Sequence, residues 1–591
     1  MAENKGENHI GALHDEDYKE KYFEPLIDHN SMVYDVSREK ESLNGRWNFQ
    51  IDQYDTFLRA DWYSNKKEDE TGLELPLDHD FEQWEEINVP ACWNTESDKY
   101  LYYEGPAVYH KSFKYSNYGE DKVFLKLGAA NYDSYIFLNQ KFVGHHQGGS
   151  TPFMLDITEN LAKENSLQIV ADNTRRREAV PTKNTDWFNY GGIYRDVELL
   201  RLPETYIKDF SLALAEASYQ KMDLNLEVAG KELNGEAILK IPELDLEVKT
   251  KLENGMAELS FAAEPELWSP DNPKLYQVIL TYAGDQIEEK IGFRQIKVEG
   301  RDIYLNGEKI FLKGIAAHEE SVANGKAVTE AEVIENIKLA KEMNCNYIRL
   351  AHYPHSYKVA QIADEMGVML WEEIPVYWAI DFKNQRTYND AENQLLELIK
   401  RDINRASVII WSVGNENEDT DARLNFMSGL AKKAKEIDPT RLVSAACLVD
   451  EKNNRISDRL TDYLDIIGQN EYYGWYIPDI SKLIDCMENS KPDKPVVITE
   501  FGAGALSGER GTKDDLFTED YQLQVYQKQT EVLGNIEYIK GLSPWILFDF
   551  RCPRRTNKYQ KGYNRKGLLS ADKNHKKMAF YEMQRFYSEI E

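Results

Sequence analysis

The hydrophobic and polar positions along the chain change their spacing near residue 300. Before this point, short runs alternate between apolar and polar residues, as in "SYIFLNQKFVG" and "KLYQVILTYAG". After it, short apolar runs are separated by stretches with apolar residues every three or four positions, as in "TEAEVIENIKLAKEMN". The first spacing is typical of half-buried β-strands and the second of amphipathic helices. The pattern therefore predicts an all-β part followed by alternating strands and helices.

The all-β part divides into three segments. Residues 1–35 are mostly polar, with two small apolar patches, "HIGAL" and "YFEPLI", and we interpret them as an N-terminal arm. Residues 36–202 contain many short alternating runs, which predict a β-sandwich of the jelly-roll type. Residues 203–295 have regularly spaced turns, the pattern of an immunoglobulin-like β-sandwich.

Residues 296–591 predict a closed (β/α)8 barrel, the TIM barrel fold. Eight short apolar runs alternate with helical patterns in this segment, which is the element order of such a barrel. A doubly wound open sheet has a similar alternation, but no Gly-rich phosphate-binding turn follows any of the runs. We therefore expect a barrel with strands at 310–315, 346–351, 368–373, 408–413, 442–446, 465–469, 495–499 and 541–547.

One predicted strand changes character at its end. In "VIIWSVGNENED", residues 408–419, the apolar run is followed by the polar run 415–418. Asn and Glu are common at helix starts, so an ordinary strand-to-helix loop is one interpretation. In a TIM barrel, however, the C-terminal ends of the strands carry the chemistry. Nearly every predicted strand is followed by residues suited to a site: His318, Glu319, His352, Glu372, Glu373, Asn415, Glu416, Asn470, Glu500, Trp545 and Asp549.

Glu416 and Glu500 follow the fourth and seventh predicted strands, on opposite sides of the barrel mouth. Glycoside hydrolysis needs two such carboxyl groups, one protonated to donate to the leaving oxygen and one ionised to attack the anomeric carbon or activate water. The charge of one carboxylate raises the pKa of the other, which helps to keep one of them protonated. Metal catalysis is the alternative, but no HExxH or facial-triad spacing occurs within one element, so we expect no metal.

Composition narrows the possible partners and the compartment. The net charge of −31 argues against nucleic acid or an anionic membrane as a partner. No apolar run approaches the ~18 residues of a transmembrane helix, and the acidic N-terminus lacks the apolar core of a signal peptide. The five cysteines are scattered, odd in number and without metal-ligand spacing. We therefore expect a cytoplasmic protein with free thiols.

Several segments resemble glycoside hydrolase family 2. "WSVGNENE" and "PVVITEFGA" resemble the acid/base and nucleophile segments of this family, and "RLAHYPHS" and "NEYYGWY" resemble its barrel signatures. "LNGRWNFQ", "FLNQKFVGHHQGGSTPFMLDIT" and "WFNYGGIYRDVEL" resemble its sugar-binding domain. The resemblance covers residues 40–591, and it implies a retaining double displacement without a cofactor.

The resemblance also implies roles for single residues. Glu416 would be the acid/base and Glu500 the nucleophile. Asn415 would hydrogen-bond the sugar 2-hydroxyl, and Asp186 would reach from the first domain to another sugar hydroxyl. For two of the remaining positions, Tyr476 and Trp545, packing alone is the alternative. The sugar subsite would be lined by His352, Asn470, Tyr476 and Trp545.

A basic segment follows the eighth predicted strand. Residues 551–566, "RCPRRTNKYQKGYNRK", contain seven Arg or Lys residues and no acidic residue. A solvated loop that balances the acidic surface, or a salt-bridge patch between subunits, is one interpretation. Because the segment lies at the barrel mouth, a receptor for an anionic sugar is the other. "NRK" resembles the Asn-x-Lys signature of β-glucuronidases, so Asn564 and Lys566 would bind the C6 carboxylate of a uronide.

The expected substrates are β-D-glucuronides or β-D-galacturonides, as conjugates or oligosaccharides. The segment after the third predicted strand, "IPVYWAIDFKNQRTYNDAEN", is short, which predicts an open mouth that admits larger substrates. A β-galactosidase of the same family and a non-catalytic carbohydrate-binding protein are the alternatives, and the presence of both Glu416 and Glu500 argues against the second. Members of the family are commonly oligomers, so we expect a homo-oligomer, a tetramer or a hexamer, with the N-terminal arm at a subunit interface.

Overall fold

The computed structural model describes residues 26–69, 71–116 and 121–590, which form two compact units. The first unit contains the residues up to Thr174, together with Asn189–Tyr206 and Gly325–Ala327. The second contains Arg175–Phe188, Ile207–Asn324 and the chain from Val328 onward. Among the residues described, none of the helices has the length and apolar character needed to cross a membrane.

The first unit is a β-sandwich, as predicted for this part of the chain. Its core is built from large side chains that alternate along the strands, including Trp47, Phe49 and Tyr109, all almost fully buried. One sheet has four strands, in the order β10 (Phe153–Asp156), β6 (Lys122–Leu127), β13 (Val197–Leu202) and β2 (Lys40–Ser42). The other has seven, in the order β1 (Leu26–Ile27), β9 (Lys141–Gln147), β8 (Asp133–Leu138), β11 (Glu164–Asp172), β5 (Pro106–Lys114), β3 (Gly45–Ile51) and β4 (Glu85–Val89).

The end of the predicted N-terminal arm belongs to this sandwich. Strand β1 pairs in parallel with β9, with Leu26 opposite His145 and Ile27 opposite His146. Ile27 is buried in the sandwich core, whereas Leu26 is exposed. The last two residues of "YFEPLI" thus pack against a sheet edge, and "HIGAL" lies outside the described residues.

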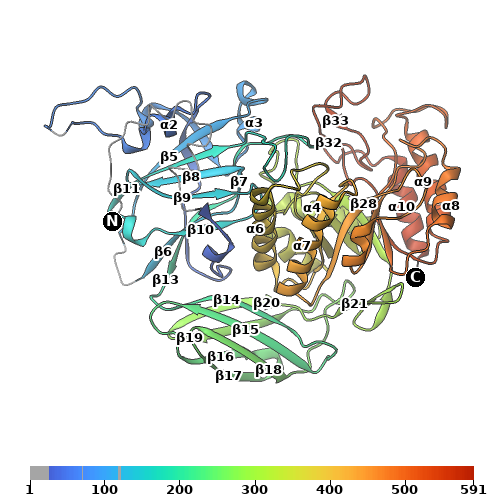
Figure 1. Ribbon diagram of the computed structural model, residues 1–591, viewed down its shortest axis with the longest axis horizontal. Coiled ribbons are helices and arrows are strands. Elements are labelled where there is room, and N and C mark those ends of the chain that lie inside the picture. Colours follow the sequence, from blue (N-terminus) through green and yellow to red (C-terminus); the bar gives the residue numbers. More distant parts are fainter. Residues whose placement is uncertain (1–25, 70, 117–120, 591) are drawn as a thin grey trace. The chain divides into compact units, whose positions relative to one another are not determined.

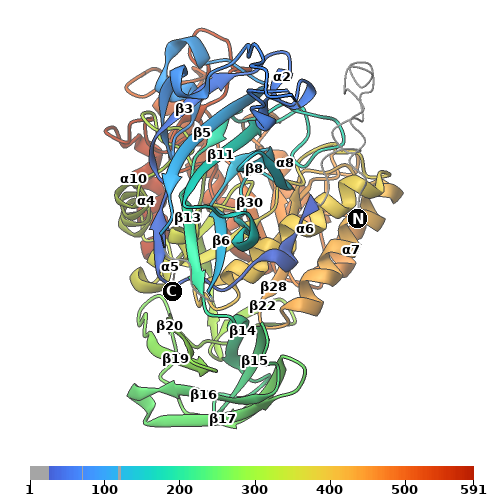
Figure 2. The same cartoon turned by 90° about the vertical axis from the view of Figure 1, so that its left-hand side faces the viewer.

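The second unit begins with the predicted immunoglobulin-like sandwich. In β19 (Tyr276–Tyr282) and β20 (Asp285–Ile291) every second residue is buried, the alternation that a two-layer sandwich requires. These strands continue a four-stranded sheet with β16 (Gly235–Ile241) and β17 (Leu246–Leu252), which lie side by side in Figure 2. The facing sheet contains β14 (Tyr206–Leu214), β15 (Lys221–Ala229) and β18 (Met256–Ala262).

The predicted TIM barrel is confirmed. Eight parallel strands pair in chain order, and β24 closes the barrel on β31. A small hairpin sheet, β21 (Ile296–Glu299), β22 (Asp302–Leu305) and β23 (Glu308–Ile310), precedes the first of them. The barrel strands are β24 (Leu312–Ala317), β25 (Tyr347–Leu350), β26 (Met369–Glu373), β27 (Val408–Asn415), β28 (Leu442–Leu448), β29 (Ile467–Asn470), β30 (Val496–Glu500) and β31 (Ile539–Leu542).

Helices follow the barrel strands, and several begin at a capping side chain. Thr329 and Glu332 form a reciprocal capping box at the first of them, and Asn384, Thr420 and Thr518 cap others. Helices α6 and α7 pack side by side (Figure 1). The helices are α4 (Glu330–Glu342), α5 (Tyr357–Met366), α6 (Gln385–Asp402), α7 (Asp421–Ile437), α8 (Ser481–Asn489), α9 (Glu519–Leu533) and α10 (Met578–Glu589), with a 3-10 turn η8 (Arg459–Tyr463) between β28 and β29.

The eighth strand differs from its prediction. It was expected at 541–547, but β31 ends at Leu542, and Trp545 and Asp549 follow it in an irregular segment. Pro544 lies just beyond the strand and has no N–H to donate, so a regular ladder cannot continue through it. The chain instead pairs irregularly, with Ser543 N–H donating to Ile498 and Trp545 N–H donating to Phe501.

Candidate active site

The strands that carry Glu416 and Glu500 both contain an extra residue just before the carboxylate. In β27, Ser412 pairs with Ser444, but Asn415 pairs with Ala446, so one residue is inserted relative to β28. In β30, a similar shift occurs between Ile498 and Glu500. Such β-bulges turn the chain and re-aim side chains next to active sites. Glu416 itself has a φ of 53°, in the left-handed region that non-glycine residues seldom occupy.

The segment 415–418 ends β27 and begins the loop that leads to the next helix. Helix α7 begins only at Asp421 and is capped by Thr420. The run between strand and helix instead lies at the mouth of the barrel, and Glu416 lines a pocket of about 470 Å³. Besides Glu416 and Glu500, this pocket is lined by predicted site residues Asp186, His352, Asn470, Tyr476, Trp545 and Lys566.

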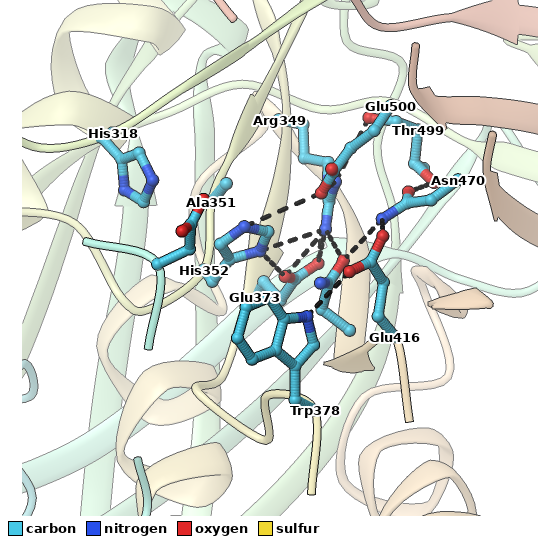
Figure 3. A network of polar contacts seen from close by, with 12 residues as sticks. His318, Arg349, Ala351, His352, Glu373, Trp378, Glu416, Asn470, Thr499 and Glu500 are labelled. Atoms are coloured by element: carbon cyan, nitrogen blue, oxygen red, sulfur yellow. Dashed lines mark hydrogen bonds and ion pairs between the residues drawn. The ribbon is translucent and has the colours of Figure 1, made fainter. Parts of the chain in front are cut away.

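Glu416 is held by two neutral hydrogen-bond donors. Asn470 Nδ2 donates to Oε1 at 3.0 Å, and the indole Nε1 of Trp378 donates to Oε2 at 2.8 Å (Figure 3). Burial of the carboxyl and the nearby charge of Glu500 raise its pKa to about 7, against these two hydrogen bonds. Glu416 is therefore largely protonated in mildly acidic solution and can donate a proton, which is what a general acid requires.

Glu500 has the opposite environment. Arg349 Nη1 donates to its Oε1 at 2.9 Å, and the hydroxyl of Tyr472 donates to its Oε2 at 2.7 Å. His352 Nε2 lies 3.7 Å from Oε1. A guanidinium ion pair and a hydroxyl donor favour the charged form of a carboxylate. The site thus combines one carboxyl surrounded by neutral donors with one bound to a cation, an arrangement suited to an acid and a nucleophile.

Arg349 connects several buried polar groups of the site, including Glu373 and Glu500, as Figure 3 shows. It is fully buried and contacts both oxygens of Glu373, at 2.9 and 3.0 Å, as well as Glu500. Burial alone would lower its pKa, but the charges of the two carboxylates raise it. Despite its own burial, Glu373 has a lowered pKa because Arg349 and His352 face it. Two buried carboxylates therefore share one permanently charged guanidinium.

Asn415 is oriented by this network. Its Oδ1 accepts from Arg349 Nη2 at 2.8 Å and from Asn470 Nδ2 at 3.1 Å. Its Nδ2 is buried and has no hydrogen-bond partner among the described residues. A buried amide without a partner is costly unless another group completes it. The Nδ2 of Asn415 thus lacks a partner, but Asn415 is not among the residues that line the pocket, and its predicted bond to a sugar hydroxyl stays a prediction.

Lys566 is a buried cation on the pocket wall. It is 4% exposed, and its Nζ donates to the hydroxyl of Tyr476 at 2.8 Å. The ammonium also lies 4.9 Å from the ring centroid of Tyr472 and 4.6 Å from that of Tyr476. Within the part of the chain that the structure describes, no carboxylate lies within 4.0 Å of it. A buried charge is normally paired, so the position lacks an anion.

Asp186 and Asn564 are joined by a hydrogen bond, and of the two only Asp186 is among the pocket-lining residues. Asp186 lines the pocket, but Arg555 binds both its oxygens, at 3.1 and 2.5 Å. Asn564 is fully buried; its Nδ2 donates to Asp186 at 3.1 Å, and its Oδ1 accepts from the backbone N–H of Lys566. Asn564 therefore does not line the pocket itself. It holds the Asp186 side chain and positions the backbone N–H of Lys566.

His352 and Trp545 form one wall of the pocket. Their rings stack at 4.8 Å with an interplanar angle of 23°, and His352 Nδ1 lies 2.9 Å from Glu373 Oε1. Other polar strand-end residues lie outside the pocket lining. Glu372 points away from Glu373 and is fully buried 3.7 Å from Arg401 of α6, and Asp549 pairs with Lys577 at 2.7 Å. His318 and Glu319 contact Tyr353 and Ser356.

Sequence reasoning missed three residues that contact the two carboxylates: Arg349, Trp378 and Tyr472. Arg349 and Tyr472 occur within the family-like segments "RLAHYPHS" and "NEYYGWY", so the signal was present but no role was assigned. Trp378 lies in the short segment after β26 and carried no signal of its own. Within residues 26–69, 71–116 and 121–590, no group of three or more His, Cys, Asp or Glu side chains is arranged to hold a metal.

Models of known protein families show which family the chain belongs to. The model of the glycosyl hydrolases family 2 TIM barrel domain matches residues 296–591. The family 2 sugar binding domain matches residues 40–203, and a third family 2 model matches residues 205–294. The chain belongs to glycosyl hydrolase family 2. This glycoside hydrolase has the family's three domains in the family's order.

The relatives of this chain include enzymes with different activities. The chain is 27% identical to a beta-glucuronidase of Streptococcus agalactiae, over 94% of this chain and 96% of that protein. It is 31% identical to a beta-galactosidase of Thermoanaerobacterium thermosulfurigenes, over 68% of this chain and 57% of that protein. The solved structure of a beta-D-glucuronidase from Dictyoglomus thermophilum aligns with a TM-score of 0.80 and 26% identity, covering 96% of this chain and 99% of that one.

Proposed function

We propose that this family 2 enzyme is a retaining exo-acting β-glucuronidase. The observation that carries the proposal is Lys566, a buried ammonium on the pocket wall with no carboxylate partner among the described residues. The C6 carboxylate of a uronide would supply the missing anion and form charge-assisted hydrogen bonds with Lys566 and the Tyr476 hydroxyl. The likeness to beta-glucuronidases over nearly the full chain supports the same substrate.

The reaction proceeds by two displacements at the anomeric carbon. In the first, Glu500 attacks this carbon while Glu416 gives its proton to the leaving oxygen, so that a covalent glycosyl-enzyme forms. In the second, Glu416 takes a proton from water, which displaces Glu500 and restores the β configuration. Arg349 and Tyr472 hold the Glu500 side chain in place through an ion pair and a hydrogen bond. Trp378 and Asn470 fix the direction of the Glu416 carboxyl.

β-Galacturonides and β-galactosides are the second candidates. The match to a beta-galactosidase favours the latter, but an uncharged galactoside leaves Lys566 buried without an anion. Glucuronides and galacturonides differ only at C4 and carry the same carboxylate, so galacturonide hydrolysis belongs to the same proposal as a weaker second activity.

The test compares three 4-nitrophenyl substrates with the purified protein: the β-glucuronide, the β-galacturonide and the β-galactoside. We expect the highest kcat/KM for the glucuronide, with NMR showing the β-anomer of the product first. Glu416→Gln and Glu500→Gln are the matched controls: Glu500→Gln should abolish hydrolysis and Glu416→Gln should slow it strongly, while both variants stay folded. Preference for the galactoside would overturn the uronide assignment, and initial release of the α-anomer would overturn the retaining mechanism.

A further inference from the structure

Two basic side chains of the pocket lining lie next to different catalytic carboxylates. Lys566 lies against the ring of Tyr472, whose hydroxyl donates to Glu500. Arg554 lies with its guanidinium carbon 5.0 Å from the ring centroid of Trp378, whose indole N–H donates to Glu416. Figure 3 shows Trp378 directly beside Glu416. The two cations are thus each one aromatic ring away from one of the two carboxylates.

This placement separates the two cations by function. A nucleophile lies below the anomeric carbon of the sugar, whereas the acid/base lies beside the oxygen that joins the sugar to the leaving group. Lys566, on the Glu500 side, therefore belongs to the sugar. Arg554, on the Glu416 side, belongs to the leaving group.

The charge of Arg554 is only partly balanced. Its Nη1 donates to Asn184 Oδ1 at 3.3 Å, and its Nε lies 3.7 Å from Asp186 Oδ1. Asp186, however, is already bound on both oxygens by Arg555. The Arg554 side chain is 47% exposed and lines the same pocket. Glu451, a solvent-exposed residue, adds one negative charge to the lining. The Asp186 carboxylate thus faces two guanidinium groups, those of Arg555 and Arg554, so Arg554 can bind a further anion.

We propose that Arg554 is a specificity residue for an anionic leaving group, a carboxylate or a sulfate carried by the unit next to the sugar. The natural substrates would then be acidic at both units, as in an acidic oligosaccharide. A planar guanidinium binds either oxyanion with two parallel hydrogen bonds. The inference rests on the proposed function, because it specifies the leaving group of the glucuronides that the enzyme would hydrolyse.

The experiment uses leaving groups of similar shape and different charge, and it compares the ratio of their kcat/KM values between wild type and variants so that differences in leaving ability cancel. The β-glucuronide of 4-hydroxybenzoate is compared with that of its methyl ester, and the β-glucuronide of 4-hydroxybenzenesulfonate provides a sulfate-like arm. We expect Arg554→Ala to lower the acid-to-ester ratio of kcat/KM about three- to tenfold, since a half-exposed charge pair contributes less than a buried one. Arg554→Lys should recover part of the ratio. Lys558→Ala, which removes the same charge from the same segment outside the pocket lining, should leave the ratio unchanged.

Several outcomes would overturn the inference without touching the proposed function. Equal losses on acid and ester in Arg554→Ala would mean that Arg554 acts through Asp186 or Trp378 rather than on the leaving group. If neither the acid-to-ester nor the sulfonate-to-ester ratio changes in Arg554→Ala, Arg554 does not select the leaving group. The same fall in Lys558→Ala would mean that the effect arises from general surface charge. A response restricted to the sulfonate arm would support the inference and assign the group as a sulfate.

If the wild-type enzyme hydrolyses none of the glucuronides, including the neutral ester, the proposed function itself fails and the inference falls with it.

Discussion

Replacing Lys566 with methionine removes the charge of the pocket wall while keeping most of the side-chain volume. The ammonium is 4% exposed and donates one hydrogen bond, to Tyr476, so a substrate carboxylate would meet it in a nearly dry site. A hydrogen bond to a charged group contributes about 1.5–3 kcal/mol. At ~1.36 kcal/mol per factor of ten, Lys566→Met should lower kcat/KM for a glucuronide about 10- to 150-fold.

The assay measures kcat/KM for 4-nitrophenyl β-glucuronide and 4-nitrophenyl β-glucoside in parallel. The glucoside has the same ring configuration but no carboxylate, so its rate should change far less than that of the glucuronide. Lys558→Met is the matched control: it removes one charge from the same segment, where Lys558 lies 4.6 Å over the ring of Tyr559. Added salt should weaken glucuronide turnover less than the substitution does, because buried charges are poorly screened.

Two results would refute this reasoning. Equal losses on glucuronide and glucoside would mean that Lys566 supports the segment 551–566 and does not bind the substrate carboxylate. A loss of equal size in Lys558→Met would mean that the effect arises from the field of the whole segment. The first of these results would make the galactosidase alternative the stronger one.

Three further predictions concern the acid, the buried cation and the N-terminal arm. Because the pKa of Glu416 is raised to about 7, its proton is present below that pH and lost above it, so kcat/KM should fall above pH ~7. This fall should disappear with a 2,4-dinitrophenyl leaving group, which needs no proton. A fall that persists with that leaving group would contradict the assignment of Glu416 as the acid. Arg349→Met leaves Glu373 and Glu500 buried without a cation and should lower the free energy of unfolding by about 3–5 kcal/mol in urea titrations. An unchanged urea midpoint would show that the ion pairs of Arg349 are not needed for stability. Deleting residues 2–24 retains β1 and should keep the Tm while lowering the number of subunits per particle, calculated from light scattering with the mass of the shortened chain. An unchanged number of subunits would contradict the proposal that the arm lies at a subunit interface.

Strand-level features of the fold could be predicted from the sequence because buried strands leave a local signal. The run 408–413 is apolar throughout, and β27 indeed begins at Val408. The eighth strand was misplaced because "SPWIL" is as apolar as a strand, while Pro544 prevents regular pairing there. The ends of elements depend on hydrogen bonds to distant residues, such as Trp545 to Phe501, and those partners are not visible in the local pattern.

The residue types of the site could be predicted from the sequence, but the hydrogen bonds and ion pairs between these residues largely could not. Glu416 and Glu500 were found because barrel topology brings the strand ends together. The bulges that aim them, and the Arg349 side chain between Glu373 and Glu500, depend on register between strands far apart in sequence. Likewise, no local pattern indicates that Asp186 would be bound by Arg555, 369 positions away in the chain.

Trapping the glycosyl-enzyme tests the central claim most directly. A 2-deoxy-2-fluoro-β-glucuronyl fluoride should react with the enzyme and accumulate as a covalent adduct. The 2-fluoro group slows both displacements, whereas the good fluoride leaving group speeds only the first, so the glycosyl-enzyme forms faster than it is hydrolysed. Peptide mass spectrometry after proteolysis should then place one fluoroglucuronyl group on Glu500. A label on any other residue, or full activity of the enzyme after incubation with no label at all, would contradict the account.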